Sequence, residues 1–307
     1  LHEADVALQD SDVKRLLSEQ VDDSHDTRVL NGFDFNDVDQ ETFASYRRVF
    51  LNRSPNHVWN SQADLEFLTS LGGWRRDRDT GDTGLTVAGL VMFGKMRSIQ
   101  DEFPNYMLDY QERPEAKTEK RWIDRITLDG SWSGNLYDFY RKVFHKITSE
   151  LKVPFTLSDG QRLDETGVHV ALREALANSL VHADFTGRAS ILIVKRPDMF
   201  GFRNPGLMRI PVDVALRGGE SDCRNRTIHQ MFRMVGIGEQ AGSGIPQIFQ
   251  GWKEQHWNPP KLHEAIEPYD QTLLELRMID LFPEETILHL RTLFDGDFDR
   301  LDYTARV

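Results

Sequence analysis

Several features that would assign a chain to a common class are missing from these 307 residues. Cys223 is the single cysteine, which excludes an internal disulfide framework and fits a reducing cytosol. No apolar run approaches the roughly 20 residues that span a bilayer, and no basic segment followed by an apolar one opens the chain. We therefore expect a cytoplasmic protein without a membrane partner. No cluster of cysteine and histidine has zinc-site spacing, and no Gly-x-x-x-x-Gly-Lys-Ser/Thr motif supports a P-loop helicase.

Positive charge is also scarce in the composition as a whole. The formal net charge is −12 and the pI is about 5.3. Proteins that hold nucleic acid by neutralising its phosphates usually have a basic balance or a basic face. Basic residues gather only locally, at 75–78 and 217–226. We therefore expect non-specific DNA binding by these residues to be weak.

The order of hydrophobic patterns predicts an α+β protein. Its predicted helices cover residues 39–50, 62–71, 85–93, 135–151, 166–182, 227–235 and 244–256. Its predicted strands cover residues 106–110, 122–128, 189–195, 198–203 and 272–278. The polar stretch 209–226 has few large apolar residues, as expected of a mobile lid.

The helix predicted at 166–182 is the most informative segment. Glu174, Asn178 and His182 are spaced four apart, so they project from neighbouring turns of one face. The opposite side carries a stripe of small and apolar residues: Leu172, Ala175, Leu176, Ser179, Leu180 and Ala183. Such a polar ridge can hold a divalent metal and activate a water, or it can simply be a solvated helix face.

A glycine-rich segment follows later in the chain. Gly242, Ser243 and Gly244 stand where a helix is predicted to begin, and backbone N–H groups there are suited to phosphate oxygens. The alternative interpretation is a flexible loop in which Ser243 caps the helix. If the segment binds phosphate, it must face the Glu174–Asn178 ridge across a gap sized for a triphosphate.

Four segments carry a resemblance to a known family: 173–182 with its Glu-x-x-x-Asn, 202–206 with Asn-Pro-Gly, 223–225 with Cys-Arg-Asn, and 239–245 with Gly-Ser-Gly. In this order they resemble the GHKL (Bergerat-fold) ATP-binding superfamily of gyrase, MutL-type repair proteins, heat-shock chaperones and histidine kinases. The bacterial branch of RecG-like carboxy-terminal domains (HATPase_c_4) is more similar. The resemblance covers roughly residues 155–280.

This resemblance implies a role for each motif. Asn178 matches the asparagine whose amide oxygen binds Mg²⁺, and Glu174 matches the glutamate that activates the attacking water. Asn204 and Gly206 stand in the turn that contacts adenine, although the family usually has Asp-x-Gly-x-Gly there. An amide oxygen still accepts the adenine hydrogen bond, but it is a weaker acceptor than a carboxylate.

Two further residues are assigned less directly. His182 extends the ridge and either assists near the phosphates or is satisfied by hydrogen bonds at the helix end. Arg224 either reaches the γ-phosphate or has a solvated or interface role. Together with Gly242, Ser243 and Gly244, these residues complete the predicted nucleotide site, with ATP and Mg²⁺ as its cofactors.

The resemblance also implies an organisation for the whole chain. The expected units are the end of an AlbA_2 (Schlafen-like) domain at 1–30, an α+β connector at 31–152, the ATP-binding domain at 153–280 and the start of a winged helix at 281–307. The ATP-binding domain is expected to be a Bergerat-type α/β sandwich with helices on one face of a mixed sheet.

Two functions from different classes remain open at this point. One is a module that binds Mg-ATP, with or without slow hydrolysis, within a larger bacterial transcriptional regulator. That regulator would contact DNA through domains outside this chain and form a homodimer. The other is a degenerate GHKL scaffold that serves dimerisation or partner binding without hydrolysis. A histidine-kinase core is disfavoured because no phospho-acceptor helix pair is recognisable.

Overall fold

The computed structural model describes residues 25–114, 122–149, 151, 156–158, 161–163, 166–238, 242–278, 289 and 292–293. The predicted units at 1–30 and 281–307 therefore lie almost entirely outside the described residues. The remainder is an α+β protein built on one mixed sheet, which confirms the predicted fold class.

The central sheet has six strands. They follow one another across the sheet as β4 (Asp124–Thr127), β3 (Leu108–Glu112), β7 (Ile191–Arg196), β8 (Met199–Pro205), β10 (Gln271–Arg277) and β9 (Lys261–Ala265). β3 and β7 are parallel, and the other neighbouring pairs are antiparallel. Strands from both predicted ranges, 31–152 and 153–280, thus share one sheet.

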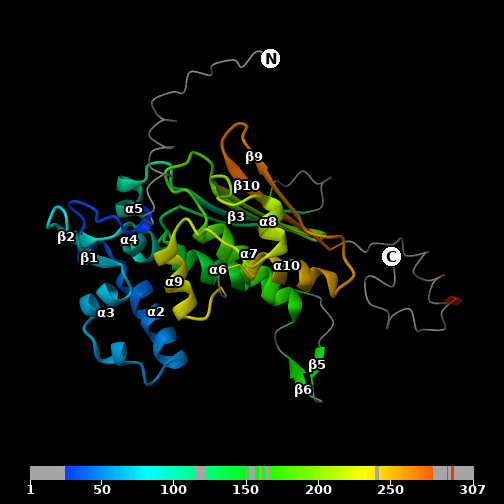
Figure 1. Cartoon of the computed structure of the whole chain (residues 1–307), viewed down its shortest axis with the longest axis horizontal. Helices are drawn as coiled ribbons and strands as arrows, with labels where there is room; N and C mark the ends of the chain where they lie inside the picture. Colours follow the sequence, from blue (N-terminus) through cyan, green and yellow to red (C-terminus); the bar gives the residue numbers. More distant parts are fainter. Residues whose placement is uncertain are drawn as a thin grey trace, which may run out of the picture.

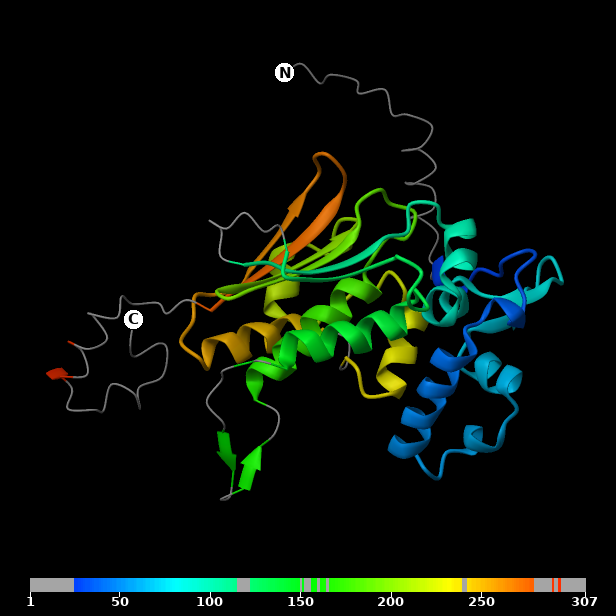
Figure 2. The same cartoon turned by 180° about the vertical axis from the view of Figure 1, so that it is seen from behind.

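Helices pack on one face of this sheet, with α7 and α10 lying beneath it in Figures 1 and 2. The helices of the described part are α2 (Gln40–Arg53), α3 (Asp64–Ser70), α4 (Val87–Phe93), α5 (Met96–Glu102), α6 (Leu136–Thr148), α7 (Gly167–Val181), α8 (Val212–Arg217), α9 (Arg226–Met234) and α10 (Gly244–Lys253). Short 3₁₀ turns are η1 (His25–Thr27), η2 (Phe35–Asp37) and η3 (Val58–Ser61). Two small hairpins pair β1 (Trp74–Arg76) with β2 (Thr83–Leu85) and β5 (Thr156–Ser158) with β6 (Gln161–Leu163).

Local signals place several helix ends. The Asp39 carboxylate accepts from the Thr42 N–H at the start of α2, and Asn135 caps α6 in the same way through the Asp138 N–H. The predicted stretch 209–226 is not irregular throughout, because it contains α8. The predicted Asn-Pro-Gly turn also begins later than expected. Asn204 and Pro205 belong to β8, since they pair with β10, and the chain turns at Gly206 with φ of 90°.

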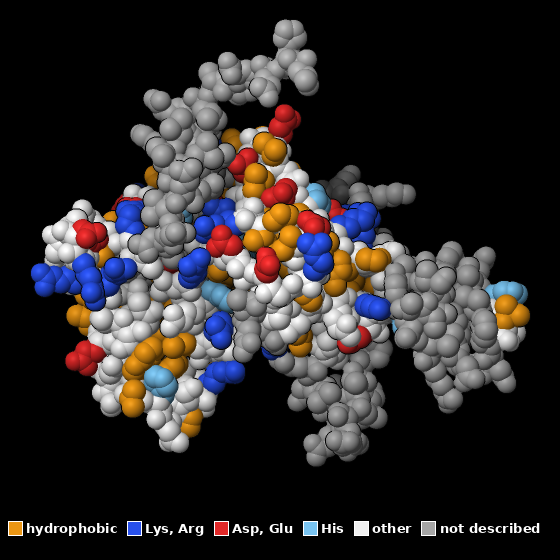
Figure 3. Space-filling model, viewed as in Figure 1, with side chains coloured by type: hydrophobic (Ala, Val, Ile, Leu, Met, Phe, Trp, Pro, Cys, Tyr) orange, Lys and Arg blue, Asp and Glu red, His pale blue; other side chains and the backbone are white. Residues whose placement is uncertain are grey.

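The basic group at 75–78 lies on the β1–β2 hairpin, where Lys and Arg side chains gather in Figure 3. Asp77 is part of the same hairpin. Its carboxylate accepts from the backbone N–H groups of Thr80 and Asp79, which lowers the pKa of Asp77. With Asp79 and Asp82 beside it, the hairpin has as many acidic as basic residues. The hairpin as a whole therefore carries no net charge.

Helix α7 differs from its predicted form. The pattern predicts one packed side and one solvated side, but residues on almost all sides of α7 are buried, Glu174 among them. The reason is its central position: α7 contacts α6, α9, α10 and strands β7 and β8. Its polar ridge therefore does not face bulk solvent.

Glycines allow α7 and α10 to approach closely. A Cβ at Gly251 would overlap the carbonyl oxygen of Gly167, and it would lie 2.8 Å from the carbonyl carbon. Gly167 in turn lies near the Cα of Gly251 and the side chain of Glu254. Because backbone touches backbone at this crossing, α10 is held directly against the ridge-bearing helix.

Helix α9 joins the amino-terminal helices to α7. The buried Asp26 carboxylate accepts from the Ile228 N–H at 2.8 Å, and the buried Tyr46 hydroxyl donates to the Met231 carbonyl at 2.6 Å. Burial raises the pKa of Tyr46 well above its ordinary value, so this hydroxyl stays protonated. Two polar contacts from distant parts of the chain thus fix α9.

Candidate functional site

A cavity lies between α7, the helix-facing side of the sheet and residues 207–224. Its open space amounts to about 1030 Å³, a figure that includes space continuous with the solvent. Most of the predicted site residues line it together: Glu174, Asn178, His182, Asn204, Arg224, Gly242 and Gly244. Gly206 and Ser243 do not line this cavity.

The ridge forms one wall of this cavity. Glu174 is only 2 % exposed, and Asn178 follows one turn later at the cavity surface. A Cβ at Gly244 would lie 3.0 Å from Asn178 Nδ2 and 3.0 Å from Glu174 Oε2. The ridge and the glycine segment therefore meet on the same side of the sheet, in direct contact. The expected gap between Asn178 and Gly244 is absent because α10 packs tightly, and the open space lies beside this contact.

The glycine segment also touches the stretch that follows α8. Gly242 has φ of 84°, and a Cβ there would lie 2.8 Å from the carbonyl carbon of Gly219. The Gly219 N–H donates to the Gly242 carbonyl at 3.0 Å. Ser243 makes no side-chain capping bond to α10. Glycine at 242 is therefore required by its backbone angle and by the passing chain.

The sheet supplies the opposite wall. Asn204 is 7 % exposed, and its Nδ2 donates to the Pro205 carbonyl at 3.2 Å. Thr272 is its cross-strand partner on β10, and its hydroxyl donates to the Gly206 carbonyl at 2.9 Å. Phe202 and Leu274 line the cavity next to this pair. One end of the cavity thus combines an amide, a hydroxyl, an aromatic ring and an aliphatic side chain.

Thr272 and Leu274 were not identified from the sequence. Both lie in the predicted strand 272–278, and they alternate toward the cavity with the period of two that strands impose. Their pairing with Asn204 and Phe202 depends on the β8–β10 register. The alternation of side chains along this strand would have identified Thr272 and Leu274 as facing the same side, but not the residues with which they pair.

The segment after β8 covers the cavity and is tied down at several points. The Met208 N–H donates to Glu264 Oε1 at 2.6 Å, and Arg209 pairs with Asp222 at 3.0 Å. Arg224 is 6 % exposed, and its guanidinium donates to the carbonyls of Leu207 at 3.0 Å and His182 at 3.3 Å. Arg224 therefore braces the covering segment against the end of α7.

Two titratable groups beside the cavity are neutral at physiological pH. Burial, together with the nearby His229 and Arg224, lowers the pKa of His182 to about 4. Burial raises the pKa of the Cys223 thiol to about 12, and its Sγ lies 3.8 Å from the Val181 carbonyl oxygen. The thiolate form of Cys223 and the imidazolium form of His182 are therefore not available here.

The donor set at the ridge suits a hard cation. Glu174 and Asn178 offer carboxylate and amide oxygens, which Mg²⁺ prefers, and Mg²⁺ usually keeps several waters or phosphate oxygens as its other ligands. In the described part of the chain, no three His, Cys, Asp or Glu side chains form a metal-binding group. These residues therefore fit a magnesium ion that arrives with a phosphate better than an all-protein metal site.

Comparison with protein families gives two partial matches. Residues 189–272 match HATPase_c_4, described as "Putative ATP-dependent DNA helicase recG C-terminal", which confirms the predicted resemblance to RecG-like carboxy-terminal domains over this range. The range contains Asn204, Arg224 and the glycine segment, but not α7. Residues 14–109 match a domain of unknown function, DUF8451. No match was found among curated proteins.

A solved structure shares the fold. The DIP2311 protein from Corynebacterium diphtheriae is similar with a TM-score of 0.62 and 15% sequence identity. The likeness covers 91% of this chain and 52% of that chain, so this chain spans about half the length of that protein. No helix among the described residues is both long enough and apolar enough to cross a membrane.

Proposed function

We propose that the cavity binds ATP with Mg²⁺, and that residues 153–280 form a Bergerat-type nucleotide-binding domain of the GHKL kind. One observation carries this proposal: a single cavity is lined by residues from three separate parts of the sequence, namely Glu174, Asn178, Asn204, Gly242 and Gly244. The HATPase_c_4 match over 189–272 supports it.

The adenine would lie at the Asn204 end. The Asn204 amide oxygen accepts from the exocyclic amino group, and Thr272 stands beside it on the next strand. Phe202 and Leu274 provide apolar surface for the ring. An amide is a neutral acceptor, so we expect this bond to be weaker than one made to a carboxylate.

The phosphates would lie toward Asn178 and the glycine segment. Mg²⁺, when bound, neutralises the phosphate charge, and the Asn178 amide oxygen would be its protein ligand. Glu174 is the candidate catalytic residue, because its carboxylate lies one turn from Asn178 and can accept a proton from an attacking water. Arg224 would act as a positioning residue, since it holds the covering segment to α7.

Calorimetry and thermal unfolding with Mg-ATP test the binding. A ligand at 100 times its Kd stabilises the native state by about 2.7 kcal/mol. Asn178→Ala should remove most of that shift, whereas Asn52→Ala, the same change at an exposed position on α2, should leave it intact. The absence of heat and of any thermal shift at millimolar Mg-ATP would refute the proposal.

The adenine end has its own test. Asn204→Asp restores a charged acceptor, which is worth about 1 kcal/mol more than a neutral one and so tightens ATP binding about fivefold. The change should not strengthen binding of inorganic triphosphate, which has no base. If the variant binds both ATP and triphosphate more tightly, or neither, the adenine does not bind at Asn204.

The alternative function is a scaffold that does not hydrolyse ATP. The direct contact of Gly244 with Asn178 and Glu174 favours it, because this contact occupies part of the expected phosphate space. Glu174→Gln separates the two functions. In an ATPase this variant binds ATP and loses turnover, whereas in a scaffold the parent chain has no turnover to lose and light scattering should report ATP-independent self-association.

The wider setting is also a proposal. We infer that this module belongs to a cytoplasmic, DNA-associated bacterial regulator with an AlbA_2-like domain before it and a winged helix after it. The words "DNA helicase" in the HATPase_c_4 description support a DNA-associated setting, and the DUF8451 match does not bear on it. Crosslinking of the parent protein to DNA in cells tests this setting.

A further inference from the structure

The central sheet has a second face, opposite to the cavity. Side chains alternate along each strand, so Phe202 and Asn204 point toward the helices while Arg203 points the other way. The strand register places Asp109 and Gln111 of β3 on the same side as Arg203. We call this surface the outer face. The described helices that contact the sheet pack on its other side (Figures 1 and 2).

Basic residues are concentrated on the outer face. By register it carries Arg113, Arg125, Arg196, Arg203, Lys261 and Arg277, against the acidic strand residues Asp109 and Glu275. The chain as a whole has a net charge of −12. Positive charge is therefore segregated onto this side of the sheet, which the overall composition conceals.

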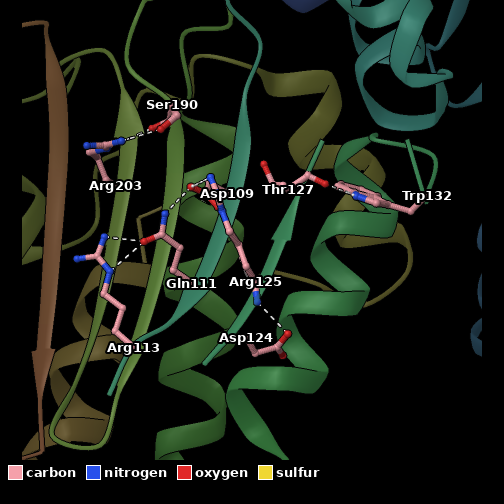
Figure 4. A network of polar contacts seen from close by, with 9 residues as sticks. All are labelled: Asp109, Gln111, Arg113, Asp124, Arg125, Thr127, Trp132, Ser190 and Arg203. Carbon is pink, nitrogen blue, oxygen red and sulfur yellow. Dashed lines mark hydrogen bonds and ion pairs between the residues drawn. The ribbon is translucent and has the colours of Figure 1, made fainter. Parts of the chain in front are cut away.

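A network of hydrogen bonds and ion pairs holds some of these arginine side chains in place (Figure 4). Arg125 binds both carboxylate oxygens of Asp109, at 2.8 and 3.0 Å. The Gln111 amide nitrogen donates to Asp109 at 2.5 Å, and its oxygen accepts from Arg113 at 2.9 and 2.7 Å. Asp109 and Gln111 are only 6% and 7% exposed. The arginines are thus held in place before any partner arrives.

Not every cation on this face is neutralised. Arg196 pairs with Asp198, Arg277 with Glu275 and Arg125 with Asp109. Among the described residues, no carboxylate pairs with Arg113, Arg203 or Lys261. Arg203 instead binds the Ser190 hydroxyl at 2.6 Å and the Ser190 carbonyl at 3.3 Å.

Arg113 and Arg203 also repel each other. Burial lowers the pKa of Arg203, and the positive charge of Arg113 adds to that effect while Asp109 opposes it. The Arg203 guanidinium stays charged, because the ordinary pKa of arginine lies far above physiological pH. An anion placed between the two arginines would relieve the repulsion, so this part of the face favours negative ligands.

The spacing of the cations calls for an extended anion. Arg113 follows β3 and Lys261 begins β9, four strand spacings away, which corresponds to about 19 Å. Leu192, Val194 and Leu273 lie between them on the same face and are half-buried. One phosphate cannot bridge this distance, and the apolar surface suits unpaired bases.

We propose that the outer face, centred on Arg113, Arg203 and Lys261, binds the phosphate backbone of a single-stranded nucleic acid. Its bases would lie over Leu192, Val194 and Leu273. Because the contacts are made to phosphates, binding is sensitive to salt. The proposal does not depend on nucleotide binding in the cavity.

Fluorescence anisotropy with a labelled 12-nucleotide oligothymidylate tests it, with no ATP present. Three phosphate contacts give a slope of about −2 for the logarithm of affinity against the logarithm of salt concentration. Arg113→Ala/Arg203→Ala should reduce this slope to about −0.7 and weaken binding on the order of 25-fold at 0.1 M salt. Arg48→Ala/Lys142→Ala removes the same charge from exposed helical positions and should leave binding unchanged.

Competition experiments separate the single strand from other polyanions. The oligonucleotide should bind more tightly than a duplex of the same length and than a synthetic peptide of residues 1–24, which carries seven acidic and two basic residues. Tighter binding of the duplex or the peptide would overturn the proposal, as would equal binding by the double variant. The Asn178→Ala variant should bind the oligonucleotide as the parent chain does. Nucleotide binding in the cavity and oligonucleotide binding on the outer face can therefore be refuted separately.

Discussion

Replacement of Gly251 by alanine tests the close crossing of α7 and α10. Position 251 lies inside a regular helix, where alanine is intrinsically more favourable than glycine by about 1 kcal/mol. Helix propensity alone thus predicts that Gly251→Ala stabilises the protein. The structure predicts the opposite, because the added Cβ would overlap the carbonyl oxygen of Gly167.

The size of the effect follows from what can move. The atoms facing the new methyl group are backbone atoms of Gly167, and the Cβ of Ala171 lies 3.1 Å away on the same helix. No flexible side chain can yield, so α10 must shift away from α7 as a unit. Overpacking of this kind destabilises the folded state by about 3 kcal/mol, the upper end of its usual range. The higher helix propensity of alanine stabilises it by about 1 kcal/mol. We expect a net loss of about 2 kcal/mol.

Thermal and urea unfolding measure this difference. With an unfolding entropy of about 2.1 cal/mol/K per residue, a loss of about 2 kcal/mol lowers the Tm of a 307-residue protein by about 3 °C. Gln250→Ala is the matched control, since Gln250 is the preceding residue of α10 and is exposed. It should change stability by less than about 0.5 kcal/mol. A Gly251→Ala variant as stable as the parent, or more stable, would show that the two backbones do not touch.

Three further predictions concern buried groups. The pKa of His182 is about 4 in the folded protein and near 6.5 when exposed, so stability is complete above pH 6.5 and falls as the pH drops toward 4. The loss should reach at most about 3 kcal/mol in urea titrations, and His182→Asn should remove that part of the slope. Cys223, whose pKa is raised to about 12, should resist iodoacetamide at pH 8 in the native state and react in urea; rapid native labelling would contradict its burial. Asp26→Ala leaves the buried Ile228 N–H without its acceptor and should cost about 1–3 kcal/mol in thermal unfolding, so an unchanged Tm would contradict this contact.

Local signals in the sequence were sufficient for much of the fold. The Asp39 cap and the apolar spacing after it place α2, and the helix predicted at 166–182 matches α7 almost residue for residue. β9 escaped prediction because its residues, Lys-Leu-His-Glu-Ala, are mostly polar. It is an edge strand, paired on one side only, so little hydrophobic patterning is needed to hold it.

The candidate site was predictable where it depends on spacing along one helix. Glu174 and Asn178 line the cavity as the periodicity of 166–182 indicates. Contacts between distant segments were not predictable. The position of Thr272 beside Asn204 requires the β8–β10 register, and the two carbonyl partners of Arg224 require the tertiary path of residues 207–224. The contact of Gly244 with the ridge arises from the α7–α10 crossing, which depends on glycines in two separate helices.

Strand β8 connects the two proposed surfaces. Phe202 and Asn204 line the cavity, while Arg203 between them points to the outer face. A shift of one residue in the β8–β10 register would exchange these roles and place a guanidinium in the cavity. The pairing of Thr272 with Asn204, reinforced by the Thr272 hydroxyl bond to Gly206, opposes such a shift. The same register therefore sets the polarity of both faces, and a change that weakens it should damage nucleotide binding and oligonucleotide binding together.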